Sequence, residues 1–209
     1  GSGISLDGVG FNLGTTTVTW TATDEEGNEI TCLFDVLVED TEDPSFIACG
    51  AVSNQSVSND AGSCTYVHKG LAWDATATDN CTVSTIEYEL TGATTARGSN
   101  SLSGVDFELG TTTVTWTVTD ESGNISTCEF DVIVADDQAP IIAGCTNVDP
   151  EVVADAGVCT FEANTDWDIT ATDNCGIASI EYELTGATTA SGSNSLSGVD
   201  FELGTTTVT

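Results

Sequence analysis

One twelve-residue stretch recurs along the chain and constrains its fold more than any other feature. It reads LGTTTVTWTVTD over residues 109–120, is almost unchanged over residues 13–24, and begins again over residues 203–209. The three copies start about 95 residues apart, which is too long for a helical solenoid unit and typical of one small β-sandwich domain. The sequence therefore predicts a tandem array of similar domains.

The recurring stretch also carries the pattern of a strand. Val114, Trp116 and Val118 share one parity and threonines take the other, which is the alternation of a half-buried strand whose threonines face water. A turn-forming segment, DESGN, follows at residues 120–124, and a second alternating run then continues from residue 128 to residue 134. This order predicts a β-hairpin with a loop of about five residues.

The rest of the repeat completes an all-β fold. We predict further strands at residues 45–49, 63–69 and 82–90, a long loop at residues 73–81, and a short edge strand with turns at residues 91–104. About seven strands without a helix indicate tandem immunoglobulin-like antiparallel β-sandwiches.

Two acidic segments that end in proline, DTEDP at residues 40–44 and DDQAP at residues 136–140, predict the linkers between domains. Residues 1–39 are then the C-terminal part of a first repeat, residues 40–135 a complete repeat, and residues 136–209 the N-terminal part of a third. We expect these residues to be a section of a longer polymer of repeats, because partial units need further strands to close their cores.

The charge of the chain excludes several classes of partner. It has 34 acidic and 2 basic residues and a net charge of −32, so it repels nucleic acid and anionic membranes and attracts cations. A hydrophobic fraction of 39% with regular alternation argues against intrinsic disorder. No apolar run is long enough to insert into a bilayer.

Several motifs together resemble hyalin repeats, or HYR domains: ATDNC, GTTTVTWTVTDESGN, and C-x-F-x-V-x-V followed by DDQAP. The resemblance extends over essentially the whole chain. It implies an immunoglobulin-like adhesion module that is extracellular and displayed at the cell surface. The four-cysteine version is similar to the long arrays in giant surface adhesins of Bacteroidota, including gliding-motility adhesins exported by type 9 secretion.

Eight cysteines at recurring positions indicate an oxidising compartment, and four of them within one repeat permit three connectivities. We favour Cys64–Cys81, with the counterpart Cys159–Cys175, and Cys49–Cys128, which would join the first and last strands. Each bond would stabilise the domain by roughly 2 to 4 kcal/mol. A rival scheme, Cys32–Cys49 and Cys128–Cys145, would join adjacent domains across the linkers; otherwise Cys32 and Cys145 pair outside this chain.

Acidic and amide side chains are predicted to converge where domains meet. The linker, the loop before the third predicted strand and the final hairpin loop should lie at one pole of the sandwich, and such a set of hard oxygen ligands suits Ca²⁺. The alternative is that these are ordinary turn residues. The arrangement resembles the calcium-rigidified linkers of cadherins, although the residues are not the cadherin motif. The candidate ligands are Asp40, Glu42, Asp43, Asp79, Asn80, Asp120 and Asn124 at one junction, and Asp136, Asp137, Asp173 and Asn174 at the next.

No catalytic set is built into the repeat. His68, the single histidine, is replaced by alanine at the matching position of the next repeat, and Arg97 by serine. We therefore expect a structural stalk, with neighbouring repeats as its partners, in surface adhesion or gliding motility. The alternative is that the repeats themselves bind a glycan, a protein or another filament through the Gly/Ser/Thr-rich stretch at residues 91–103, which recurs at residues 185–197.

Overall fold

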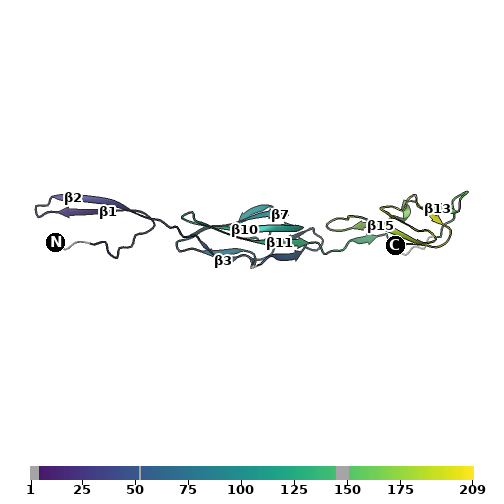
Figure 1. The fold of residues 1–209 in the computed structure, drawn as a ribbon, viewed down its shortest axis with the longest axis horizontal. Helices are drawn as coiled ribbons and strands as arrows, with labels where there is room; N and C mark the ends of the chain where they lie inside the picture. The colour runs from purple at the N-terminus through teal and green to yellow at the C-terminus, as the bar shows by residue number, and fades with distance from the viewer. Residues whose placement is uncertain (1–4, 52, 145–150) are drawn as a thin grey trace. The chain divides into compact units, whose positions relative to one another are not determined.

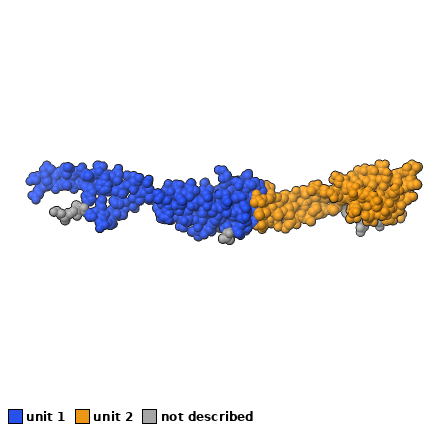
Figure 2. Space-filling model, in the orientation of Figure 1, with its two compact units in different colours: residues 1–55, 68–105, 112–132 blue, residues 56–67, 106–111, 133–209 orange. Residues whose placement is uncertain are grey.

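The fold is all-β, as the sequence predicts. The computed structural model describes residues 5–51, 53–144 and 151–209. Two compact units divide the chain: residues 1–55, 68–105 and 112–132 form unit 1, and residues 56–67, 106–111 and 133–209 form unit 2 (Figure 2).

The recurring stretch forms the predicted hairpin twice. β1 (Gly14–Thr23) pairs antiparallel with β2 (Glu29–Val38), and β10 (Gly110–Asp120) lies beside β11 (Ile125–Ala135) in the middle of the chain (Figure 1). Both loops close in the same way: Asp24, directly after β1, and Asp120, the last residue of β10, each accept the N–H of the asparagine four residues later, at 2.7 Å in each loop. The turn is therefore encoded locally, by side chains that hydrogen-bond their own loop.

β10 and β11 belong to a five-stranded sheet in the order β4-β11-β10-β7-β8. Its other members are β4 (Gln55–Ser58), β7 (Val83–Gly92) and β8 (Ala96–Ser99). Two smaller antiparallel pairs complete the repeat: β3 (Ser45–Cys49) with β6 (Ala75–Thr78), and β5 (Thr65–Val67) with β9 (Asp106–Glu108).

The described part of residues 45–135 thus holds nine strands where about seven were predicted. The predicted loop at residues 73–81 is wrong in part, because residues 75–78 form β6. Small alternating side chains gave this strand no apolar signal, but its backbone pairs with β3. The long loop is therefore a strand between two short turns.

Beyond residue 140 the same pairings recur. β12 (Ile141–Ala143) pairs with β14 (Thr170–Thr172), β13 (Thr160–Glu162) with β17 (Asp200–Glu202), and β15 (Glu181–Gly186) with both β16 (Ala190–Ser193) and β18 (Thr206–Val208). One short 3-10 helix, η1 (Thr165–Trp167), is the only helix among the described residues. The repeated sequence therefore folds twice in the same way.

The core of unit 1 follows the predicted alternation of β10. Val114, Trp116 and Val118 are fully buried, while the threonines between them are half-buried. Tyr88 of β7 lies opposite Trp116 and packs edge-on against it, with ring centroids 5.4 Å apart. The Trp116 indole Nε1 donates a hydrogen bond to the Trp73 carbonyl oxygen at 3.2 Å, so the largest core side chain is satisfied.

One glycine is required by this packing. Gly50 follows β3 with φ at 66°, a conformation that side-chain-bearing residues rarely adopt. A Cβ atom at this position would press against the Trp73 carbonyl oxygen and the Phe130 ring. The backbone can approach the core this closely only without a side chain.

Candidate metal centre and disulfide bonds

In unit 1, the first linker meets the loop that follows β6. A carboxylate oxygen of Asp40, a carboxylate oxygen of Asp79 and the Cys81 Sγ all lie within 4.8 Å of one another. Asp79 uses Oδ2 to accept the N–H groups of Cys81 at 2.8 Å and Thr82 at 3.2 Å, which holds the loop in place. Two predicted ligands, one from the linker and one from the loop, are therefore brought together.

Two oxygen atoms of this cluster have no hydrogen-bond donor. Asp40 Oδ2 and Asp79 Oδ1 are shielded from solvent and have no hydrogen-bond partner among the residues that the structure describes. Burying a carboxylate oxygen without a partner is costly, and two carboxylates at this separation repel each other. Loss of solvation, followed by a hydrogen bond to Asp40 and then by the charges of Asp40, Asp79 and Asp120, raises the pKa of the Cys81 thiol. The local potential is thus negative and favours a cation.

Unit 2 repeats the arrangement with the second linker. A carboxylate oxygen of Asp136, one of Asp173 and the Cys175 Sγ again lie within 4.8 Å of one another. Asp173 accepts the Cys175 N–H at 2.8 Å, as Asp79 accepts that of Cys81. The linker–loop contact is therefore a property of the repeat and not of one copy.

Asp120 and Asn124, the ligands predicted in the hairpin loop, bond to each other and to the linker backbone. Asp120 is buried, and its two oxygens accept the Asn124 N–H at 2.7 Å and the Asn124 Nδ2 at 2.8 Å. Burial alone would raise the pKa of Asp120, but these bonds and backbone N–H groups of the loop lower it overall. Asn124 Nδ2 also donates to the Asp40 carbonyl oxygen at 3.2 Å. The pair closes its own loop and ties that loop to the linker.

Other predicted ligands lie near the clusters without belonging to them. Asn80 Nδ2 donates to Asp40 Oδ1 at 3.5 Å, and the Glu42 N–H donates to the same oxygen at 3.2 Å. Asp137 accepts the Ser58 hydroxyl at 2.7 Å instead of joining Asp136. The two groups of mutually close ligand atoms among the described residues include neither Glu42 nor Asp43. The sequence interpretation missed both cysteines, although each directly follows a candidate Asp-Asn pair.

Two disulfide bonds are present among the described residues. Cys49 of β3 is bonded to Cys128 of β11, a pair that the sequence favoured, with Cα atoms 6.0 Å apart. Cys64 is bonded to Cys175, with Cα atoms 4.9 Å apart, whereas Cys81 and Cys159 are free and exposed.

The predicted Cys64–Cys81 and Cys159–Cys175 bonds are therefore not the ones formed. The physical reason is that residues 75–78 form a strand that pairs with β3. Cys81, which follows this strand, therefore lies beside Asp40 of the first linker. The rival scheme is also absent, since Cys49 and Cys128 bond each other and Cys32 is free. Cys145 lies outside the described residues.

The comparison with known protein families decides the relationship of this chain. The HYR domain profile matches residues 4–38 and 39–134. The chain belongs to the HYR domain family. The resemblance read from the motifs is thereby confirmed at the level of the family.

Curated relatives contain HYR-like sequence within longer chains. Hyalin of Strongylocentrotus purpuratus is 30% identical over 187 residues, which is 86% of this chain and 14% of that protein. Hyalin of Lytechinus variegatus is 31% identical over 80% of this chain and 29% of its own length. A mouse protein named for its sushi, von Willebrand factor type A, EGF and pentraxin domains is 31% identical over 59% of this chain and 3% of its length. The chain thus spans less than a third of each hyalin.

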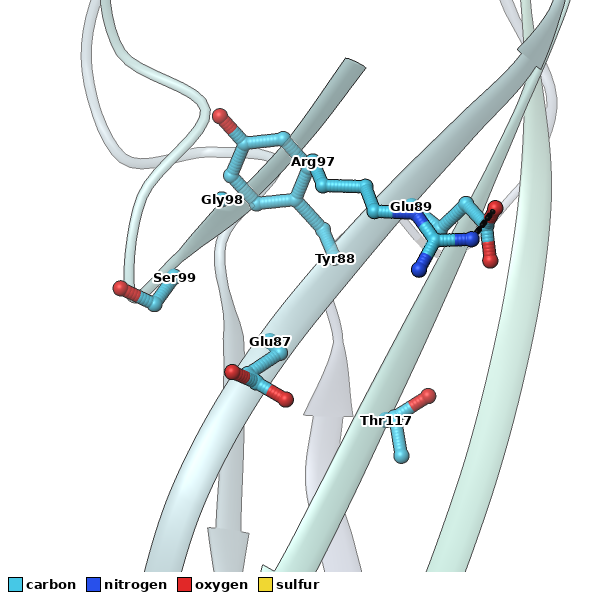
Figure 3. A pocket seen from close by; sticks show the side chains of 7 residues that line it. All are labelled: Glu87, Tyr88, Glu89, Arg97, Gly98, Ser99 and Thr117. Atoms are coloured by element: carbon cyan, nitrogen blue, oxygen red, sulfur yellow. Dashed lines mark hydrogen bonds and ion pairs between the residues drawn. The ribbon is translucent and has the colours of Figure 1, made fainter. Parts of the chain in front are cut away.

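A surface hollow of the HYR repeat lies over β7 and β8, and residues 97–99 of the Gly/Ser/Thr-rich stretch considered as a binding surface form part of its lining. Figure 3 shows the Tyr88 ring lying over Gly98, where a Cβ atom would collide with the ring. Arg97 forms an ion pair with Glu89 there; the Arg97 side chain is largely exposed and that of Glu89 about half exposed. Tyr182 and Gly192 repeat the contact in unit 2, but Arg97 is replaced by Ser191. The repeated feature is therefore the packing of a tyrosine on a glycine backbone.

None of the described helices is long and apolar enough to cross a membrane.

Proposed function

We propose that this HYR segment is a structural part of an extracellular filamentous adhesin or stalk, stabilised by disulfide bonds and stiffened by Ca²⁺ at its linkers. The observation that carries the proposal is the contact between a linker carboxylate and the Asp-Asn-Cys loop, present in unit 1 and again in unit 2. Two disulfide bonds fit a compartment outside the cytoplasm. This role requires no catalytic group.

The donor set supports a hard divalent cation. Asp40 Oδ2 and Asp79 Oδ1 are buried and lack donors, and a cation between them would replace the missing partners and remove their repulsion. Asn80, next to Asp79 and already in contact with Asp40, could supply a further oxygen. Ca²⁺ accepts six to eight such oxygens in flexible geometry. The Cys81 Sγ is a soft donor, so Zn²⁺ is the competing ion that a test must include.

Thermal unfolding with added ions tests the proposal. With 1 mM Ca²⁺ and a Kd of about 0.1 mM, which is typical of extracellular sites, ion binding should raise the free energy of unfolding by about 1.4 kcal/mol. For a domain of this size the expected rise in Tm is about 6–11 °C. Chelator should reverse the rise, and calorimetric titration should give the number of ions bound.

Paired variants locate the ion. Asp40→Asn combined with Asp79→Asn should abolish the shift, whereas Glu87→Gln, an exposed carboxylate on β7, should leave it intact. If Ca²⁺ moves the Tm of the double variant as much as that of the parent, the ion binds elsewhere. A response to Zn²⁺ alone would replace calcium as the proposed ion.

Adhesion by the repeats themselves is the second candidate. The observation that favours it is the near-identity of residues 91–103 and 185–197. In unit 1 this stretch supplies Arg97, Gly98 and Ser99 to the lining of the surface hollow over β7 and β8. Binding of the chain to a glycan array, lost on deletion of residues 93–95, would support this role over that of a passive stalk. Display at the cell surface and a part in gliding motility after type 9 secretion are proposed on the motif resemblance alone.

A further inference from the structure

The Cys64–Cys175 bond joins two different positions of the repeat. Cys64 lies in the motif DAGSCT, whose counterpart is DAGVCT at residues 155–160, so Cys64 corresponds to Cys159. Cys175 lies in ATDNC, whose counterpart is ATDNC at residues 77–81, so it corresponds to Cys81. The bond therefore connects the second cysteine of one repeat to the third cysteine of the following repeat, 111 residues later.

A polar network surrounds the Cys175 sulfur of this bond. Asn59 is almost fully buried, and its Nδ2 lies 3.4 Å from the Cys175 Sγ, 2.9 Å from the Ser63 carbonyl oxygen and 3.0 Å from Asp136. Asn174 Nδ2 donates to the same Ser63 carbonyl oxygen at 2.7 Å. Gln138 Nε2 donates to Asn59 Oδ1 at 3.3 Å. The bond thus lies in a site built by the second linker and two loops.

The free thiol of Cys81 lies in the same surroundings as Cys175. Each cysteine donates its N–H to the preceding aspartate, and each Sγ lies within 4.8 Å of that aspartate and of the linker aspartate. The half of the site that belongs to the following repeat is therefore already formed around Cys81.

The free thiol of Cys159 lies in a loop folded like that around Cys64. The Asp60 N–H donates to the Thr65 carbonyl oxygen at 2.7 Å, and the Asp155 N–H to that of Thr160 at 2.8 Å. Asp60 Oδ2 accepts the Val67 N–H at 3.0 Å, and Asp155 Oδ2 accepts the Glu162 N–H at 2.9 Å. The half of the site that belongs to the preceding repeat is therefore formed around Cys159.

We propose that Cys81 and Cys159 are the two open halves of the Cys64–Cys175 disulfide, and that each bonds the complementary cysteine of a further copy of this repeat. The bonds then run head to tail, from the second cysteine of one repeat to the third of the next. Because the two bonded surfaces differ, the contact does not close on itself and extends as a linear array. Every linker would be bridged by a covalent bond, independently of any metal ion.

Bond formation requires an oxidant, for which a low-molecular-weight disulfide such as glutathione disulfide suffices. One protein thiolate attacks glutathione disulfide and releases one glutathione, and the second protein thiolate displaces the other from the mixed disulfide. The two protein thiols lose two electrons and two protons, and one glutathione disulfide becomes two glutathione molecules.

The chain itself provides the first test, in a background of Cys32→Ser and Cys145→Ser. Incubation of the concentrated protein with reduced and oxidised glutathione should give a ladder of oligomers on a non-reducing gel. Mass spectrometry of non-reduced peptides should show Cys159 linked to Cys81. Cys81→Ser alone should leave monomers, and a mixture of Cys81→Ser with Cys159→Ser should stop at dimers. Cys81–Cys81 and Cys159–Cys159 bonds in statistical amounts would overturn the proposal.

A chain extended by one repeat provides the second test. Because residues 203–209 repeat residues 109–115, residues 1–202 can be continued by residues 109–209 without a break in the pattern. Cys159 should then bond the added copy of Cys175, and replacing that added cysteine by serine should leave Cys159 open to alkylation. The inference is contradicted if Cys159 bonds the original Cys175. It is also contradicted if Cys159 stays free in a chain that has formed the Cys49–Cys128 bond. A peptide map that contains Cys64–Cys81 contradicts it as well.

Discussion

Removing the Cys49–Cys128 bond should destabilise the repeat by an amount that the structure allows us to estimate. The bond joins β3, which forms a two-stranded sheet with β6, to β11 of the five-stranded sheet, and so connects two sheets. Its sequence separation is 79 residues. The chain-entropy relation for a loop of that size gives about 4.5 kcal/mol at 25 °C. The double variant Cys49→Ser and Cys128→Ser should lose most of that stability.

Guanidinium unfolding followed by tryptophan fluorescence measures this loss, because Trp73 and Trp116 are buried in the same unit. With an m value of about 3 kcal/mol/M, the midpoint should fall by about 1.5 M. The matched control is Cys32→Ser, since Cys32 is exposed and unbonded and should change the free energy of unfolding by less than about 0.5 kcal/mol. A loss below about 1 kcal/mol in the double variant would refute the reasoning that the bond acts by restricting the unfolded chain.

Three further predictions concern the core of unit 1. Trp116→Ala should lower the free energy of unfolding, measured with urea, by about 3–5 kcal/mol. Trp20 occupies the matching position of β1 but is only half-buried, so Trp20→Ala should lower it by less than about 1.5 kcal/mol. Burial lowers the pKa of His68, although the charge of Asp74 acts in the opposite direction. As the pH falls, the unfolded chain therefore binds the proton before the folded chain does, and the free energy of unfolding should decrease below about pH 6.5. Denaturation midpoints measured over a pH series should show this decrease in the parent and not in His68→Ala. Gly50→Ala should lower the free energy of unfolding by more than about 1 kcal/mol, because the residue has positive φ, and equal midpoints for variant and parent would contradict this.

The parts of the fold that the sequence predicted well are those encoded by near neighbours. The alternation of Val114, Trp116 and Val118 with threonines predicted both a strand and its buried face, and the structure has that face. β6 was missed because its small side chains carry no apolar periodicity. It exists through backbone pairing with β3, which lies more than twenty-five residues earlier in the sequence.

The sequence predicted which kinds of residue form the candidate site, but it predicted less well which individual residues belong to it. Recurrence singled out Asp40, Asp79 and Asp120, but it does not separate a ligand from a turn residue. Asp120 and Asn124 recur because they close a hairpin loop, as Asp24 and Asn28 do in the first hairpin. Asp40 and Asp79 differ from these residues because each has one buried carboxylate oxygen that accepts no hydrogen bond from the described residues.

The sequence by itself determined the repeat, the all-β class, the two faces of the long strands and the acidity of the linkers. These follow from periodicity and turn chemistry, in which each residue acts on neighbours a few positions away. Only the tertiary structure decided which cysteines bond and which carboxylates meet. Cys64 could have bonded any of several cysteines by spacing, but the path of the backbone through β6 and the second linker brings Cys175 to it instead. Contacts of this kind depend on how distant strands pair, and no local pattern records them.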